Sequence, residues 1–535
     1  MYSTSQLFML FNSLVISLLA IFFIDFFASL LPTSSPHLSE AEQLQFYKSL
    51  LYQTRPTEAS YKTSEPTKPI RLAFCCSADL DVSVRAVDLM KVLTEQQSPE
   101  DLENLVSQHH ERITSIPELF QSFSYYFSSG AAAEQSMSSF IEFHQIVAIA
   151  KTLSNVKQSV GGNAATMAER AAAEGCQVLL GAAIGKEMRK HYNPLIQIVG
   201  ELSDQEQEDV HLVLEYGKEE SFSGFTSPRA NRYYLNHDIY NAKFSVLEAF
   251  EEALEEFQPD LVVIGGLQLM EVETDDEQRL SRLVKLSELL KNLYLQKTPS
   301  HYEFAAVSDF TLFGDTTSLV LPWVNSIGLN EQELFILHRY LVSDQEVKAT
   351  GSRPTVAQVT EQVHDILLYS KKAKMHFRSV KNVDTEVDSK KYALAQLGRM
   401  HFHTLQFHIL CQEDKSTWQD PTKALIQAAL MSTKLACGKN QKARDGIQHS
   451  SKMEIDINRV EMLLPRDILL SEKSKVSKLS LDPFTPVLTW KEADSFQCYL
   501  VPMLACKQPD HTAGLGDNIS GTGMAYHHQK DKQSV

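Results

Sequence analysis

Short apolar runs of strand length recur along the chain and alternate with stretches of helical periodicity. The runs lie at residues 70–76, 178–181, 261–266, 304–307, 319–324 and 498–501. Between them, residues 249–257 and 280–295 place apolar side chains every three to four positions, as an amphipathic helix does. Strands that alternate with helices predict an α/β fold, in which a doubly wound and mostly parallel sheet carries helices on both faces.

Two parts of the chain break this alternation. Residues 94–139 are polar, aromatic and helical in character, and residues 211–216 and 233–235 alternate like antiparallel strands joined by turns. We expect them to belong to a smaller α/β lid over the sheet, built from about residues 82–139 and 195–245. A lid of this kind would exclude water from a site on the sheet.

The N-terminal segment is apolar over residues 7–24 except for three polar side chains, and a Pro/Ser-rich stretch follows it. Its length lies between that of a signal sequence and that of a short membrane anchor. No Lys or Arg precedes it, so the usual orientation signal is missing and cleavage cannot be distinguished from anchoring. Either alternative predicts delivery to the secretory pathway, with the endoplasmic reticulum lumen or membrane, or secretion, as the destination.

This segment sets the expected domain organisation. We predict a signal peptide or membrane anchor at residues 1–31, a linker at 32–69, and one large domain at 70–535. Contact with a membrane, if there is any, is expected only through the N-terminal segment. We expect the domain to be a monomer.

The composition excludes some classes of function. Of 535 residues, 43% are hydrophobic and 22% are charged, which is typical of a globular protein. The net charge is −17 and no basic stripe interrupts the acidic excess, so we expect no nucleic-acid partner. Any phosphate group must therefore be bound by local groups.

The cysteines give no metal-binding pattern. The seven are Cys75, Cys76, Cys176, Cys411, Cys437, Cys498 and Cys506. They form no C-x-x-C pair and are too sparse for a disulfide scaffold, so we expect most of them to be buried as small hydrophobic residues. An oxidising lumen would allow a bridge or two, whose pairing the sequence leaves open.

The most informative motif is the string G-L-G-D at residues 514–517, which stands between an apolar run and a helix of small residues. It combines a glycine turn, backbone N–H groups at a helix start and the carboxylate of Asp517. Such a helix start stabilises a negative phosphoryl group, and a neighbouring carboxylate can accept a hydroxyl proton. An ordinary turn before a helix is the alternative.

Two further features favour a ligand site. Gly161-Gly162-Asn163 precedes an Ala-rich helix, so its backbone can approach a ligand closely and Asn163 can hydrogen-bond to sugar hydroxyls. Asp81 follows the first strand, where ligands bind in doubly wound sheets. A packing turn and a surface helix cap are the respective alternatives.

In their order along the chain, seven such blocks resemble the ADP-dependent sugar kinases of the ribokinase-like superfamily, and most of all the eukaryotic glucokinases among them. The blocks are residues 130–134, 161–165, 228–232, 301–303, 325–334, 401–405 and 514–517. The resemblance covers about residues 71–526. It implies a ribokinase-like fold and phosphorylation of D-glucose to glucose 6-phosphate, with ADP as donor, AMP as product and Mg²⁺ as cofactor.

The resemblance also implies roles for individual residues. Asp517 would be the general base that accepts the proton of the sugar 6-hydroxyl. The residues expected to bind the nucleotide are Arg232, Asn330, Gly514, Leu515 and Gly516, of which the last three would form an anion hole. The residues expected to hold Mg²⁺, partly through water, are Glu303, Glu333 and Asp517. The residues expected to bind glucose are Asp81, Glu134, Gly162, Asn163 and His211.

Some assignments leave alternatives open. Arg229 is a less suitable substitute for Arg232 as the phosphate-binding residue. His211 is also consistent with a structural histidine on a strand. His401 and His403 suggest a metal pair, but alternate positions next to Phe402 better fit a packed strand.

Two positions depart from the expected pattern. Ser77 stands where the family's N-A-x-x-D string has Asn, which puts the hydrogen bonds on the sugar side in doubt. Asn518-Ile519-Ser520 forms a glycosylation sequon beside the expected base. We hypothesise that burial keeps Asn518 unmodified.

Other functions remain as alternatives. Within the same class, the chain could be an ADP-dependent phosphofructokinase, although Glu134 would repel a sugar phosphate. ATP as the donor is a further variant. A non-catalytic sugar- or nucleotide-binding protein, anchored to a membrane by the N-terminal segment, is the alternative from another class.

Overall fold

The computed structural model describes residues 37–54, 69–95, 106–110, 112–203, 206–307, 309–342, 354–380, 390–414, 416, 418–439, 454–507 and 514–527. The expected signal peptide or anchor and most of the expected linker lie outside these ranges. Within them, no helix is both long enough and apolar enough to cross a membrane.

The core of the molecule is a ten-stranded main sheet. Its strands, in spatial order, are β21 (Leu488–Glu492), β22 (Phe496–Pro502), β15 (Phe407–Glu413), β14 (Arg399–His403), β13 (Ser326–Leu329), β12 (Ser300–Glu303), β11 (Leu261–Ile264), β1 (Arg71–Cys75), β5 (Gln177–Ile184) and β6 (Gln197–Glu201). Every pair from β14 to β6 is parallel, whereas β15, β22 and β21 extend the sheet by antiparallel pairing. The expected mostly parallel sheet is confirmed.

Helices bury both faces of the main sheet. They are α8 (Asn163–Ala173), α10 (Leu247–Phe257), α11 (Asp276–Leu295), α12 (Phe310–Leu319), α13 (Glu331–Val342), α14 (Val356–Arg378), α15 (Pro421–Cys437) and α16 (Leu515–Tyr526). Strand β1 shows the two layers: Ala73 and Cys75 belong to the core that contains Phe250 of α10. Leu72 and Phe74 belong to the core that contains α8. A strand buried on both faces reads as a continuous apolar run, which is why residues 70–76 predicted it correctly.

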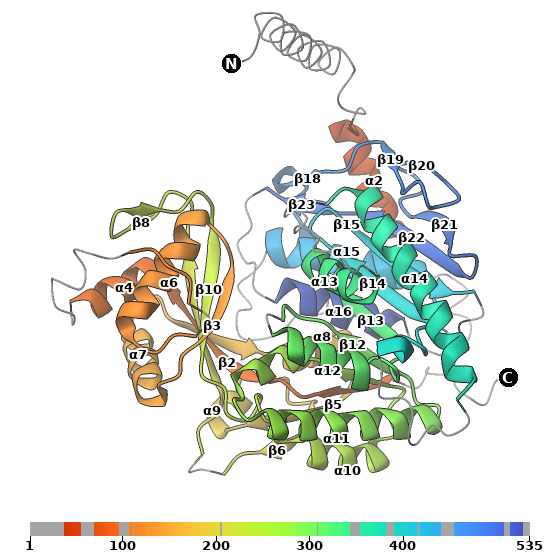
Figure 1. The fold of residues 1–535 in the computed structure, drawn as a ribbon. Coiled ribbons are helices and arrows are strands. Elements are labelled where there is room, and N and C mark those ends of the chain that lie inside the picture. The colour runs from red at the N-terminus through yellow and green to blue at the C-terminus, as the bar shows by residue number, and fades with distance from the viewer. Residues whose placement is uncertain are drawn as a thin grey trace, which may run out of the picture.

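A second sheet of five strands lies to one side of the main sheet (Figure 1). Its order is β3 (Ala133–Ser136), β10 (Asn231–Asn236), β7 (Val210–Tyr216), β2 (Asp79–Arg85) and β4 (Lys157–Gly161). The helices α4 (Ala86–Thr94), α6 (Ile116–Ser129) and α7 (Phe140–Thr152) accompany this lid sheet. The antiparallel pairing expected for residues 211–216 and 233–235 is confirmed, because β7 and β10 pair in this way.

Two predicted strands are wrong. The chain leaves the main sheet at residues 304–307, just beyond β12, and residues 319–324 form the end of α12 and a turn. In that turn Leu321 donates its N–H to the Thr316 carbonyl, and Pro322 has no N–H to offer a neighbouring strand. An apolar run indicates a buried segment, but a buried segment does not have to be a strand of a sheet.

Most of the cysteines are buried, as expected, but six of the seven are paired in three disulfides, more than the bridge or two that the sequence allowed. Cys411 and Cys498 lie opposite each other on β15 and β22 and are bonded. Cys437 is bonded to Cys506, and Cys75 to its neighbour Cys76. Cys176 keeps a free thiol.

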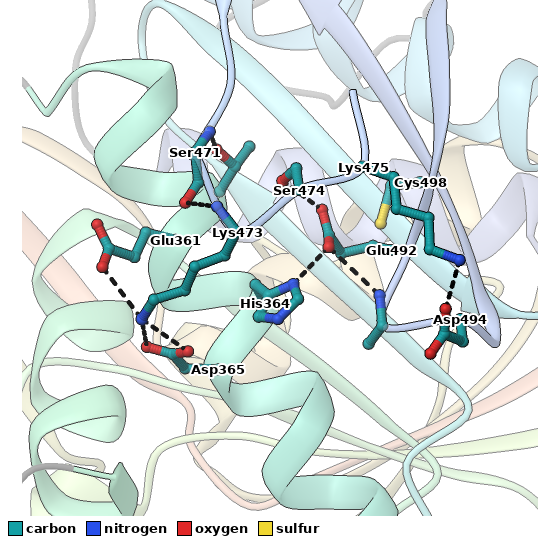
Figure 2. A network of polar contacts seen from close by, with 12 residues as sticks. Glu361, His364, Asp365, Ser471, Lys473, Ser474, Lys475, Glu492, Asp494 and Cys498 are labelled. Atoms are coloured by element: carbon teal, nitrogen blue, oxygen red, sulfur yellow. Dashed lines mark hydrogen bonds and ion pairs between the residues drawn. The ribbon is translucent and has the colours of Figure 1, made fainter. Parts of the chain in front are cut away.

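A buried carboxylate connects α14 to the antiparallel edge of the main sheet by hydrogen bonds (Figure 2). Glu492 of β21 is 2% exposed. Its Oε1 accepts from His364 Nδ1 of α14 at 2.5 Å and from the Ala493 N–H at 3.3 Å. Its Oε2 accepts from Ser474 Oγ at 2.7 Å and from Trp490 Nε1 at 2.8 Å. Four donors therefore compensate the buried charge.

Candidate active site

The expected site residues of the main sheet lie where the parallel strands end. Glu303 is the last residue of β12, and Asn330 directly follows β13. His403 is the last residue of β14. Carboxyl ends of parallel strands meet at one edge of a sheet, which is where doubly wound folds bind ligands. Helix α16 begins at the same edge, because Gly516 lies against the ring of His403.

The start of α16 presents backbone N–H groups without a side-chain cap. Gly514 is the N-cap residue, with a left-handed φ of 62°, and as a glycine it offers no side-chain cap to the first turn. A residue with a Cβ is strained in this conformation. The N–H groups of the first turn and the helix dipole therefore favour an anion at this position.

Asn518 fixes this helix start from within the protein. Its Nδ2 donates to the Gly514 carbonyl at 2.8 Å, and its Oδ1 accepts from Arg170 Nε at 2.9 Å. Asn518 is only 9% exposed. Its amide is buried and bonded on both sides, so the geometry agrees with the hypothesis that burial keeps this sequon unmodified.

Asp517 lies in the first turn of α16, and two side-chain amides fix its position through successive hydrogen bonds. Asn163 Nδ2 donates to Asp517 Oδ1 at 2.8 Å, and Gln268 Nε2 donates to Asn163 Oδ1 at 2.8 Å. Burial, opposed by the bond from Asn163 and helped by the nearby charge of Glu303, raises the pKa of Asp517 to about 7. A carboxylate that titrates near neutral pH is suited to general-base chemistry.

Gly162 and Ser77 position Asn163 at the start of α8. Gly162 has φ 84°, and a Cβ there would lie 2.7 Å from the Ser77 carbonyl oxygen. Ser77 Oγ accepts the N–H of Ala164 at 3.1 Å, and its carbonyl accepts that of Ala165 at 3.1 Å. The hydroxyl of Ser77 therefore stabilises the start of a helix, which is a structural role for the residue that replaces the expected Asn.

Glu303 is a buried carboxylate with several donors. It is 3% exposed, and its oxygens lie 2.9 Å from His301 Nε2, 3.4 Å from His403 Nε2 and 2.7 Å from Ser520 Oγ. Burial acts to raise the pKa of Glu303, but the bonds to His301 and His403 prevail and lower it to about 2. Glu303 therefore stays ionised.

Glu333 and Asn330 form a reciprocal cap at the start of α13. Asn330 donates its backbone N–H to Oε2 of Glu333 at 2.7 Å and its Nδ2 to Oε1 at 2.8 Å. In return Asn330 Oδ1 accepts the N–H of Glu333 at 3.1 Å. Burial raises the pKa of Glu333 to about 8. The pair has the pattern of a capping box, which fixes Glu333 in place.

The histidines of β14 are packed in the core. His401 is 1% exposed, neither of its ring nitrogens has a hydrogen-bond partner in the described chain, and its ring centroid lies 5.8 Å from that of His403. In the described parts of the chain, the acidic and histidine group with ligand atoms close enough for a metal ion is Asp79, Asp81 and His211. The packed strand favoured by the sequence agrees with this placement.

The expected sugar-binding residues gather on neighbouring strands of the lid sheet. Asp81 of β2 lies opposite His211 of β7. Glu134 of β3 accepts a bond from Asn236 Nδ2 of β10 at 3.1 Å. Burial raises the pKa of Asp81 to about 6, against the opposing charges of His211 and Arg232.

Arg232 and Arg229 make different contacts in the lid sheet. The guanidinium of Arg232 lies 5.7 Å from the ring centroid of Tyr234, on the strand beside Glu134. Arg229 instead donates its Nε to the Gly130 carbonyl at 2.7 Å, so it is committed to a turn. Of the two arginines, Arg232 is the one near the acidic group.

The main sheet and the lid sheet together surround Asp517. Its pKa responds both to Glu303 of β12 and to Asp81 of β2. The structure therefore brings together Asp517, Asn163, Glu303 and Asp81, residues that the sequence separates by more than 400 positions at the extreme.

Sequence reasoning missed several members of this arrangement. Gln268, Asp79 and Asp238 were not predicted, and His403 was considered only as a metal ligand. Gln268 follows Gly265-Gly266 after β11, which is a signal for a site residue that the sequence offered. Asp79 belongs to the string around Asp81, whereas nothing in the sequence marks Asp238.

Comparisons with known proteins agree with this arrangement. The model of the "ADP-specific Phosphofructokinase/Glucokinase conserved region" matches residues 70–526. An ADP-dependent glucokinase of Bos taurus is 31% identical over 460 residues, which are 85% of this chain and 84% of the relative. A probable ADP-dependent glucokinase of Caenorhabditis elegans is 30% identical over 465 residues, with 85% and 84% covered.

Solved structures agree on the fold. A hypothetical ADP-dependent phosphofructokinase from Pyrococcus horikoshii superposes with a TM-score of 0.56 at 15% identity, covering 86% of this chain and 98% of that one. An ADP-dependent kinase in complex with fructose-6-phosphate and ADPβS gives 0.57 at 15% identity, covering 91% and 98%. The expected ribokinase-like α/β fold is confirmed.

The fold, the uncapped helix start and the carboxylate beside it define a phosphotransferase of the sugar kinase class. The chain belongs to the family of ADP-specific phosphofructokinases and glucokinases.

Proposed function

We propose that this protein is an ADP-dependent glucokinase, which transfers the β-phosphoryl group of ADP to the 6-hydroxyl of D-glucose and releases AMP. The observation that carries the proposal is the position of Asp517 in the first turn of α16, a helix whose N-cap residue is a glycine without a capping side chain. The glucokinase names of its relatives from Bos taurus and Caenorhabditis elegans support the same substrate.

Each part of the α16 start has a task in the reaction. Asp517 accepts the proton of the 6-hydroxyl, and its bond from Asn163 orients the carboxylate. The N–H groups of Leu515 and Gly516 stabilise the negative charge on the transferred phosphoryl group. Arg232 neutralises a further part of the diphosphate charge when the lid sheet closes, since a guanidinium fork suits phosphate oxygens.

Glu303 and Glu333 would hold Mg²⁺, with Asp517 close by. Both carboxylates accept hydrogen bonds from the protein, yet a carboxylate has about four acceptor positions, so water molecules of a hydrated ion can still bind to them. The residues therefore fit an ion held through water. When bound, Mg²⁺ supplies positive charge to the phosphates. Asn330 contributes by fixing Glu333, because its side-chain amide is already bonded there.

The acidity of the lid sheet favours glucose over fructose 6-phosphate. Asp79, Asp81 and Glu134 interact electrostatically with one another, and Asp238 lies next to them. A sugar phosphate would bring additional negative charge to this group and be repelled. Glucose offers only hydroxyls, which carboxylates bind as acceptors.

We also propose a location in the secretory pathway, in the endoplasmic reticulum or beyond it. Two disulfides between segments distant in the sequence, Cys411–Cys498 and Cys437–Cys506, support an oxidising compartment. Protease protection of the full chain in sealed microsomes tests this location. Digestion of the intact chain without detergent would contradict it.

The central experiment uses the purified full chain, Mg²⁺ and four substrate pairs. ADP or ATP is combined with glucose or fructose 6-phosphate, and AMP and sugar phosphate are measured. We expect AMP and glucose 6-phosphate from ADP and glucose, with loss of both in the matched Asp517→Asn variant. Product from fructose 6-phosphate alone would identify a phosphofructokinase, and no product from any pair while the sugar still binds would identify a binding protein.

A further inference from the structure

Asp79 is a buried carboxylate to which the proposed reaction assigns no role. It is the first residue of β2 and is 0% exposed. Neither of its oxygens accepts a hydrogen bond from the described residues. Burial raises the pKa of Asp79 well above its usual range, and the charge of His211 opposes this shift. A buried carboxylate without donors is costly, so its presence calls for a partner that can compensate it.

The nearest charged partner of Asp79 is the ring of His211. Nδ1 of His211 lies 3.5 Å from Oδ1 of Asp79. On the other side of the ring, Nε2 lies 2.9 Å and 3.1 Å from the two oxygens of Asp238. Each ring nitrogen of His211 therefore faces a different carboxylate.

This arrangement determines what Nδ1 can do. Both oxygens of the Asp238 carboxylate lie within hydrogen-bond distance of Nε2, so Nε2 carries a proton that it donates to them. In a neutral ring Nδ1 would then be an acceptor, and it becomes a donor only if the ring is doubly protonated. The carboxylate of Asp79 next to Nδ1 favours the protonated form. Burial acts to lower the pKa of His211, but the charges of Asp238 and Asp79 outweigh it and hold the pKa well above its usual range.

Asp81 places an acceptor beside this donor. The ligand atoms of Asp79, Asp81 and His211 lie within 4.8 Å of one another. A sugar hydroxyl both donates and accepts one proton, so a carboxylate next to an imidazolium satisfies both of its hydrogen-bonding capacities. A neutral His211 with an unprotonated Nδ1 would instead give two acceptors to one hydroxyl proton.

We propose that Asp79 is a positioning residue for sugar binding, which keeps Nδ1 of His211 protonated so that it donates to a hydroxyl of the hexose while Asp81 accepts from the same subsite. The proposal deepens the proposed glucokinase function and rests on it. Asp79 itself acts through His211.

The charges that face His211 come from several elements. Asp79 and Asp81 belong to β2, Asp238 follows β10, Glu134 belongs to β3, and Asp209 precedes β7. The acidic groups on every side favour the imidazolium, and Arg232 of β10, close to Asp81, is the positive charge that opposes them. Removal of Asp79 alone removes the carboxylate that faces Nδ1.

The first test is the pH dependence of KM for glucose in the full chain and in Asp79→Asn. The donor is lost as the pH rises through the pKa of His211, so above neutral pH the KM of the wild type should increase only in clearly alkaline solution. In Asp79→Asn, KM should rise roughly 10-fold at neutral pH, as expected for the loss of a hydrogen bond from a charged donor. The pH at which KM rises should move down towards the ordinary histidine range.

A merely structural role would not move this pH profile. The kcat value should change less than 3-fold, because Asp517 and the start of α16 are untouched. Asp79→Glu serves as the conservative variant and should restore part of the affinity. An unchanged pH profile with a lowered kcat would overturn the proposal.

The second test does not depend on activity. Nitrogen-15 NMR of labelled histidine in the full chain, with His211→Gln used to assign the signal, reports whether both ring nitrogens are protonated. We expect a doubly protonated ring in the wild type at neutral pH and a singly protonated ring in Asp79→Asn. Should the chain phosphorylate no glucose, the proposed function fails, whereas this measurement still decides the state of His211.

A metal site is the competing reading of the same three residues. Calorimetric titration of the full chain with Zn²⁺ or Mn²⁺, with and without glucose, tests it. Binding that glucose displaces and that Asp79→Asn abolishes would overturn the proposal, because a metal ligand cannot be the protonated Nδ1. No such binding is the result we expect.

Discussion

Two buried carboxylates of this protein differ in how the chain compensates them. Glu492 and Asp79 are 2% and 0% exposed. Glu492 accepts bonds from four donors: His364 of α14, Ser474, Trp490 of β21 and Ala493 directly after β21 (Figure 2). Asp79 accepts none from the described residues, and its nearest group of opposite charge is the ring of His211. Both carboxylates are buried to a similar extent, so Glu492 and Asp79 differ mainly in the number of hydrogen-bond donors around them.

The difference indicates which carboxylate serves stability and which serves a ligand. A buried charge with a full set of donors fixes the elements that supply them, and its removal leaves several donors unpaired. A buried charge without donors lowers stability and persists where a substrate compensates for it. Glu303 lies between these cases, because it is buried with three partners and still stands at the edge of the site.

The largest expected effect comes from the carboxylate that takes part in the chemistry. Asp517→Asn should lower kcat on the order of 10²-fold or more, because the amide cannot accept the hydroxyl proton. The thermal midpoint should stay close to that of the wild type, since Asn163 can still bond to the amide oxygen. Steady-state kinetics and thermal denaturation together check this. Near-normal turnover would contradict the assignment of the base.

Glu492→Ala should have the opposite signature. Removal of the carboxylate leaves donors of His364, Ser474 and Trp490 unpaired, so the variant should lose about 3 kcal/mol of the free energy of unfolding. Since the network lies at the antiparallel edge of the sheet, KM for glucose should remain unchanged. Urea denaturation measures the loss. A variant that is as stable as the wild type would remove the distinction between the two carboxylates.

The rate should fall in mild acid because of Asp517. Its pKa is raised to about 7, so the group takes up a proton as the pH falls below that value and can no longer act as a base. We expect kcat to drop by about tenfold between pH 7 and pH 6 or slightly below, following a single protonation. A pH–rate profile with saturating substrates measures this. A flat profile down to pH 5 would contradict the raised pKa.

The smallest expected effect is on stability at Asp79. Asp79→Asn should change the free energy of unfolding by less than about 1 kcal/mol, because the gain from removing a buried carboxyl without hydrogen-bond donors is offset by the loss of its contact with His211. Urea denaturation beside Glu492→Ala gives the direct comparison. A loss as large as that of Glu492→Ala would show that both carboxylates are structural.

Local motifs in the sequence predicted the parts of the site that a single segment determines. Gly514 and Asp517 were predicted because a glycine turn, a helix start and a carboxylate follow one another in the chain. The strand at residues 70–76 was predicted because its apolar run is continuous. The strand predicted at residues 319–324 was wrong, because an apolar run of this composition also occurs at a buried helix end.

The partners of these residues could not be predicted from local patterns. Asn163 and Asp517 are 354 positions apart, and their hydrogen bond exists only because α8 and α16 begin at the same edge of the main sheet. Asp238 became visible only as the acceptor of His211 Nε2. The pairing of the cysteines likewise depended on strands that lie side by side.

The sequence by itself determined the α/β class and marked the glycine turn, the helix start and the carboxylate of Asp517, because each depends on residues that are neighbours in the chain. The tertiary structure decided which carboxylates are compensated and which are left to a ligand. That distinction depends on the distances between donors and acceptors from separate strands and helices, and such distances exist only after the chain has folded.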